Sequence, residues 1–161
     1  MTREERAETY HNQGFNCCQA VIAAFSDVTG LSEAQSLAVG SGNFGGFGGS
    51  SRGGGFGGGM RCGEVCGAVS GAVMVLSLTH PYNNSADLDS KNRIAHLTKE
   101  FHRRFRAQFS CERCLDLLKT DISTTEQFRA AKERGVMKKC AVYITAAVAI
   151  AEQMLEEEKN S

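Results

Sequence analysis

A glycine-rich stretch in the first half of the sequence is the feature that most restricts the fold. Twelve of the twenty residues from 40 to 59 are glycine, and such flexible backbone is too costly in entropy to hold in a helix or a strand. The stretch is therefore expected to be a long loop, which Phe44, Phe47 and Phe56 dock in part onto the core. Two roles stay open for it: a lid or ligand-contacting strip of backbone N–H groups, or a surface insertion.

The sequence on both sides of this loop predicts an all-α fold. Capping boxes, in which Ser, Thr or Asn is followed three residues later by Glu or Gln, mark several helix starts. Apolar residues then recur at helical spacing, and no set of strands is convincing. We expect a single-domain bundle of about six to eight helices over residues 1–161. The helices are expected to begin near residues 2, 16, 32, 64, 85, 114, 124 and 136.

Charge and hydropathy exclude several classes of partner. The chain has 18 basic and 18 acidic side chains and no net charge, which gives no reason to expect binding to nucleic acid or to an anionic membrane. The charged start of the sequence lacks the apolar segment of a signal peptide. The longest apolar run, residues 65–78, is too short to span a bilayer. A cytoplasmic location is therefore expected.

One motif resembles a nucleotide-binding fingerprint and is dismissed. Residues 40–45 spell G-x-G-x-x-G, but a dinucleotide site needs a strand before this motif and a helix directly after it. Here a predicted helix precedes it and more glycine follows, so no nucleotide site is expected.

Seven cysteines are the richest source of chemistry in the sequence. Three of them, Cys17, Cys66 and Cys114, fall in the first turn of predicted helices, where the helix dipole is expected to lower the pKa of a thiol. Cys140 lies on the inward face of the last helix and would complete a cluster of four. In a reducing compartment such thiols more often bind metal or carry out redox chemistry than form structural disulfides.

Two closer pairs of cysteines add alternatives. Cys62 and Cys66 would share one helix face if their helix begins early, and Cys111-x-x-Cys114 is typical of a dithiol redox motif or of half a metal site. A zinc ribbon would need a second such knuckle, which is absent, and the ligand spacings of ferredoxins are absent too. Any metal site must therefore be assembled from distant helices.

Four segments together resemble a known family. They are Asn16-Cys-Cys-Gln-Ala-Val21, Cys66-Gly-Ala-Val-Ser-Gly-Ala-Val-Met74, Cys114-Leu-Asp-Leu-Leu118 and Cys140. The order of cysteines and the C-G-A-x-x-G segment are similar to the C_GCAxxG_C_C family, whose members are described as redox proteins with four characteristic cysteines. The resemblance implies that these are Cys17, Cys66, Cys114 and Cys140. Cys18, Cys62 and Cys111 are additional, and the glycine loop is longer than the family pattern suggests.

Three functional hypotheses follow. In the first, Cys17, Cys66, Cys114 and Cys140 bind an iron–sulfur or other metal centre for electron transfer with an unidentified redox partner protein. The backbone N–H groups of Gly67 and Ala68 would then contact the cofactor, and Gly67 and Gly71 would allow its close approach.

The second hypothesis is a metal-free thiol–disulfide oxidoreductase, in which Cys66 attacks and Cys62 or another neighbouring cysteine resolves the mixed disulfide. The third is a non-catalytic module with structural zinc. Helix faces of small residues and an apolar loop are compatible with a homodimer.

Overall fold

Four helices begin at capping boxes that are visible in the sequence, and one of these is the box of Ser32 and Gln35 before α4 (Glu33–Ser41). In the computed structural model, which describes residues 1–41 and 55–161, Thr2 caps α1 (Arg3–Asn12), Asn16 caps α2 (Cys17–Ala24) and Thr124 caps α8 (Thr125–Glu133). In each box the cap side chain accepts the N–H of the third helical residue, whose own side chain accepts the N–H of the cap residue. These local bonds fix the helix starts independently of the rest of the fold.

The other elements are also helical. Over the described residues the structure has no strand. The β-type pairing there is limited to an isolated antiparallel bridge between Val65 and Arg113. The expected all-α class is confirmed. The remaining elements are α3 (Ser26–Thr29), the π-helical turn η1 (Gly59–Gly63), α5 (Gly67–Thr79), α6 (Leu88–Phe109), α7 (Cys114–Leu118), the 3-10 turn η2 (Val136–Lys138) and α9 (Lys139–Lys159).

The structure differs from the expected helices at several boundaries. Nine α-helices in the described part of the chain exceed the six to eight expected, partly because α3 follows α2 as a separate turn that ends at Gly30. Helix α5 begins at Gly67 rather than near Glu64, since the left-handed backbone of η1 precedes it. Helix α6 is capped by Asp87, not by Ser85. Most of the predicted glycine loop lies outside the described residues.

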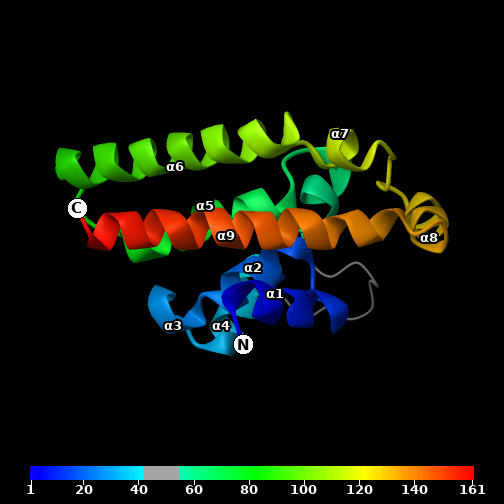
Figure 1. Cartoon of the computed structure of the whole chain (residues 1–161), viewed down its shortest axis with the longest axis horizontal. Helices are drawn as coiled ribbons and strands as arrows, with labels where there is room; N and C mark the ends of the chain where they lie inside the picture. Colours follow the sequence, from blue (N-terminus) through cyan, green and yellow to red (C-terminus); the bar gives the residue numbers. More distant parts are fainter. Residues whose placement is uncertain (42–54) are drawn as a thin grey trace.

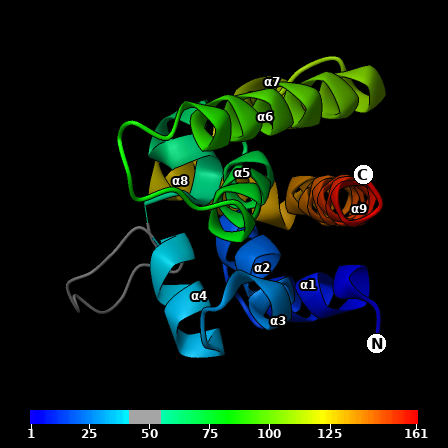
Figure 2. The same cartoon turned by 90° about the vertical axis from the view of Figure 1, so that its left-hand side faces the viewer.

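The helices form layers, as Figures 1 and 2 show. Helix α6 lies on one side, α5 and α9 occupy the middle, and α1 to α4 lie on the other side (Figure 1). Helix α2 packs against α1, α4 and α5, and all but the first of its eight residues are buried. None of the described helices combines the length and the apolar character that a membrane span requires.

Two glycines let neighbouring helices approach the backbone of α2. A Cβ atom on Gly71 of α5 would lie 2.9 Å from Val21 Cβ and 3.0 Å from the carbonyl oxygen of Cys18. A Cβ on Gly40 of α4 would lie 2.7 Å from Gln19 Cα. Both distances are too short for a real side chain, so glycine at these positions sets how closely α4 and α5 pack on α2.

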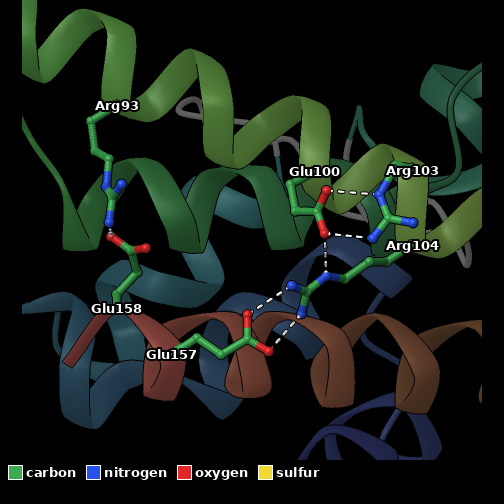
Figure 3. Close-up of polar contacts among 6 residues, drawn as sticks. All are labelled: Arg93, Glu100, Arg103, Arg104, Glu157 and Glu158. Atoms are coloured by element: carbon green, nitrogen blue, oxygen red, sulfur yellow. Dashed lines mark hydrogen bonds and ion pairs between the residues drawn. The ribbon is translucent and has the colours of Figure 1, made fainter. Parts of the chain in front are cut away.

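Ion pairs join the long helix α6 to α9 (Figure 3). Arg104 donates to Glu100 on its own helix at 2.7 Å and to Glu157 of α9 at 2.7 Å. Arg93 pairs with Glu158 at the far end of α9. Such a network adds a small, salt-dependent stabilisation to the apolar contact between the two helices.

The Glu100→Gln variant is expected to be less stable than the wild type by no more than about 1 kcal/mol at neutral pH, because these pairs lie near the surface. Hydrogen bonds from Arg103 and Arg104 lower the pKa of Glu100 from 4.5 to about 2. The stabilisation is therefore fully present above pH 4.5 and is lost as the pH falls through about 2. Urea unfolding at several pH values, with the exposed Glu156→Gln as control, measures it; a pH-independent difference would contradict this account.

Candidate redox site of four cysteines

Cys17 is the first residue of α2, and the Asn16 capping box fixes its position. Asn16 Oδ1 accepts the N–H of Gln19 at 2.9 Å, and Gln19 Oε1 accepts the N–H of Asn16 at 3.0 Å. The two side chains also donate to α4, Gln19 to the carbonyl of Leu37 at 3.0 Å and Asn16 to that of Gly40 at 3.4 Å. The buried side chains of Asn16 and Gln19 therefore have hydrogen-bond partners both within the start of α2 and in α4, and they hold the start of α2 in place.

Cys66 and Cys114 are brought together by a short antiparallel contact. The N–H of Cys66 donates to the carbonyl of Glu112 at 2.8 Å, and the N–H of Cys114 donates to that of Glu64 at 2.7 Å. These two bonds flank the isolated bridge and place the starts of α5 and α7 side by side. The Cys111-x-x-Cys114 segment therefore contributes to this contact through its backbone.

A buried carboxylate holds this contact against α6. The side chain of Glu112 is 8% exposed and accepts a hydrogen bond from Arg106 at 2.9 Å. It also pairs with His102 Nδ1. Because the carbonyl of Glu112 receives the N–H of Cys66, these pairs position Cys66 relative to the long helix.

Cys140 is the second residue of α9, directly after η2. Helix α9 begins at the end of the molecule where α7 and α8 lie (Figure 1). Cys140 and Cys17 line the same cavity, although the two residues are far apart in sequence.

All four predicted cysteines line one small cavity of about 30 Å³. Of the three residues predicted to contact a cofactor, Gly67 lines the cavity, whereas Gly71 lies outside it and packs on α2. The third, Ala68, is fully buried, and its N–H group opposes the rise in the pKa of the Cys66 thiol. The cavity lining is Cys17, Gly58, Gly59, Cys66, Gly67, Cys114, Leu117, Leu118, Ile122, Met137, Cys140 and Tyr143.

Glycine is required at the edge of this cavity. A Cβ on Gly67 would lie 3.2 Å from Cys17 Cβ and 3.1 Å from the backbone nitrogen of Cys18. Gly59 has a φ of +61°, and its Cβ would lie 2.8 Å from Cys114 Cβ. These two positions let the cysteine-bearing segments come close to one another.

The thiols of Cys17, Cys66 and Cys114 do not have the lowered pKa that their helix-start positions predict. Burial raises the pKa of Cys66 to about 11, although the N–H groups of Ala68 and Val69 oppose this change. Burial, together with repulsion from Cys66 and Cys140, raises the pKa of Cys114 to about 12. Desolvation of the thiolate therefore outweighs the helix dipole at these positions.

Cys140 is the exception among the four. The hydrogen bond that Cys17 donates lowers the pKa of Cys140 despite its burial. The same hydrogen bond, with burial, raises the pKa of Cys17 well above its ordinary value. Cys140 is thus the cysteine of the cavity that ionises most readily, a role that the sequence assigned to Cys66.

Cys140 is expected to react with iodoacetamide before Cys66 and Cys114 in reduced protein near pH 8, because the thiolate is the reacting form. Peptide mass spectrometry after timed alkylation measures the order of reaction. Exposed Cys62 is the internal standard for an accessible thiol. Faster labelling of Cys66 than of Cys140 would contradict the assignment.

The additional cysteines lie outside the cavity lining. Cys18 is buried and donates its S–H to Met74 Sδ at 3.9 Å. Cys62 is exposed and donates to the carbonyl of Gly59 at 3.5 Å, and it shares no helix with Cys66 because α5 begins at Gly67. Cys111 is half-buried.

Sequence reasoning missed several apolar neighbours of the cavity. Tyr143 lies three residues after Cys140 and so on the same face of α9. Its hydroxyl donates to the carbonyl of Leu117 at 2.9 Å, and its ring meets Phe109 edge-on at 5.0 Å. Helical spacing from Cys140 could have identified Tyr143, whereas no local signal marks Ile122 or Met137.

The comparisons with known proteins give one match. Neither the curated proteins nor the solved structures contain a match to this chain. Residues 51–154 match the family model described as "Putative redox-active protein (C_GCAxxG_C_C)". The matched range includes Cys66, Cys114 and Cys140 and begins after Cys17. Because the match covers more than half of the sequence, the chain belongs to the C_GCAxxG_C_C family.

Proposed function

We propose that this protein carries out thiol–disulfide exchange at the cysteine cavity, and that Cys17 and Cys140 form the disulfide of its oxidised state. The observation that carries the proposal is that Cys17 and Cys140, from two different helices, line the same small cavity; each shifts the thiol pKa of the other, downward for Cys140 and upward for Cys17. Cys140 lies at the start of α9 and its thiol has a lowered pKa, which suits the attacking thiolate, whereas Cys17 has a raised pKa and remains protonated. The redox description of the family is consistent with this chemistry.

The reaction has two steps. The thiolate of Cys140 attacks one sulfur of a small disulfide, forms a mixed disulfide and releases one thiolate, which takes up a proton. Cys17 then loses its proton and attacks the Cys140 sulfur of the mixed disulfide, which releases the second thiol. The substrate disulfide gains two electrons and two protons, and the two cysteines lose them.

Disulfide mapping tests the proposal. Reduced protein is oxidised by a small disulfide, the remaining thiols are alkylated, and the peptides are analysed by mass spectrometry. The expected product is a peptide pair linked through Cys17 and Cys140. A linkage of Cys62 to Cys66 would instead support the sequence-based assignment, and the absence of any intramolecular disulfide would overturn the exchange reaction.

A second candidate function is electron transfer by an iron–sulfur centre held by Cys17, Cys66, Cys114 and Cys140. The observation that favours it is the convergence of four thiols from four helices on one cavity. Repulsion among the thiolates contributes to the raised pKa values, and a bound cation would remove this repulsion. Four thiolates are also the donor set of structural zinc, the third alternative.

Four cysteine thiolates are suitable ligands for an iron–sulfur or zinc centre, but the four side chains are not positioned to bind a metal ion in this structure. The part of the chain that the structure describes contains no group of three or more His, Cys, Asp or Glu residues arranged to hold a metal ion. The four cysteine side chains would have to close around the centre. The N–H groups of Gly67 and Ala68, at the first turn of α5, would then be available to its sulfurs. An iron–sulfur centre would supply one-electron transfer.

Metal and acid-labile sulfide analysis of protein purified without oxygen separates the candidates. Near-equal iron and sulfide, lost together in the Cys114→Ser variant, would support the iron–sulfur centre. One zinc per chain would support a structural site, and unfolding on treatment with a chelator would confirm it. Metal-free protein that forms the Cys17–Cys140 disulfide would support thiol exchange.

A further inference from the structure

We propose that a pocket beside the cysteine cavity binds a small, negatively charged organic disulfide or thiol and presents it to Cys17 and Cys140. The proposal rests on the thiol-exchange function and names its substrate class. The pocket has a volume of about 310 Å³, within the range of small-molecule sites. It shares Cys17, Cys140 and part of the apolar lining with the cysteine cavity.

Three separate segments surround the pocket, so it is built by the tertiary fold. One is residues 11–17, from the end of α1 to the first residue of α2, and another is residues 57–61, which lead into η1 and form its first turn. The third runs from Ile122, in the loop before α8, through α8 and η2 to the start of α9. A ligand in the pocket would therefore contact the helix starts that carry both proposed redox cysteines.

The charged side chains of the pocket favour an anion. Arg61 and Lys132 line it, and its described lining contains no Asp or Glu. Burial lowers the pKa of the third basic residue, His11, so this ring is neutral near pH 7. A larger pocket of about 450 Å³ elsewhere on the molecule has a mixed lining, with three glutamates beside Arg3, His80 and Lys159, so a lining with cations and no described carboxylate is not a general property of the pockets of this chain.

The backbone at Arg61 is held in an unfavourable conformation. Met60 and Arg61 have φ values of +56° and +66°, which non-glycine residues adopt only when the surrounding structure compensates for the strain. Such strain is concentrated at functional sites. Here it lies in the residue that contributes a cation to the pocket.

The apolar side chains of the pocket favour a ligand with a short organic portion between its charged groups. Phe15, Ile122, Phe128 and Met137 supply apolar surface, while the two cations can hold carboxylates. A ligand with carboxylates and a sulfur on a short organic body fits this combination. As it is reduced to two thiols, Cys17 and Cys140 are oxidised to one disulfide, so electrons and protons balance.

Three small disulfides of different charge test the specificity. Oxidised glutathione is anionic, hydroxyethyl disulfide is neutral and cystamine is cationic. The rate at which each oxidises the reduced protein is divided by its rate with a free model thiol, which corrects for intrinsic reactivity. We expect the corrected rate to be at least about fivefold higher for the anion than for the cation, because the lining is cationic.

Two matched lysine variants test whether the preference for the anionic disulfide arises in the pocket. Lys132→Gln removes a pocket cation and is expected to reduce the preference for the anion about threefold. Lys138→Gln removes an exposed lysine that does not line the pocket and should leave the preference unchanged. Equal corrected rates for all three disulfides, or equal effects of the two variants, would overturn the anion site while leaving thiol exchange intact.

A binding measurement tests the anion-binding pocket independently of the thiol-exchange function. S-methylglutathione has the carboxylates but cannot exchange disulfides. When bound in the pocket, it is expected to slow the alkylation of Cys140. This protection is expected to be weaker in the Lys132→Gln variant. Protection without any oxidation by disulfides would overturn the proposed function and support the site. Absence of protection at millimolar concentration would overturn the site.

Discussion

The Cys140→Ser variant is expected to lose disulfide exchange with small disulfides, with a fall in rate of at least about a hundredfold. The hydroxyl that replaces the thiol neither ionises near neutral pH nor attacks sulfur. The other thiols of the cavity have a raised pKa and cannot replace it. Redox titration followed by alkylation and mass spectrometry measures the loss.

The Cys17→Ser variant distinguishes the attacking from the resolving thiol. With Cys17 removed, the mixed disulfide at Cys140 has no resolving partner and should accumulate as a stable adduct. Exposed Cys62 provides the control, since Cys62→Ser should retain the wild-type rate within about twofold. Loss of exchange in Cys62→Ser, or an adduct on Cys66, would return the reaction to the pair that the sequence favours.

The Gly71→Val variant is expected to lower the free energy of unfolding by about 3 kcal/mol, the upper part of the range for an overpacked core. Its Cβ would lie 2.9 Å from Val21 Cβ and 3.0 Å from the Cys18 carbonyl oxygen. Relief of these contacts requires α5 to move away from α2, in which all residues but the first are buried. Urea unfolding at constant pH measures the change.

Ser77→Val is the matched control for this substitution. Ser77 is an exposed residue of the same helix, so valine there brings only the modest cost of a β-branched side chain in a helix, about 0.5 kcal/mol. The difference between the two variants isolates the packing contribution. Equal losses of stability would show that α5 and α2 can separate without cost at Gly71.

Local sequence patterns are sufficient to predict most of the helices and the positions of the four cysteines near helix starts. The capping boxes at Thr2, Asn16 and Thr124 produce helix starts in the structure, because a cap is a bond between residues three apart. The cysteines at positions 17, 66, 114 and 140 accordingly lie at or near helix starts. The start of α5 was placed too early because left-handed backbone at Met60 and Arg61 has no sequence signature.

The ionisation of these cysteines, by contrast, depends on contacts that the tertiary structure creates. Thiol pKa values depend on burial and on neighbouring sulfurs, and residues distant in sequence supply both. Cys66 therefore has a raised pKa despite its position at a helix start, whereas the contact with Cys17 lowers that of Cys140. Gly71 likewise allows the approach of α2, since the helix opposite a glycine is set by packing. Local bonds specify the elements, and long-range contacts determine which thiols meet and which one ionises.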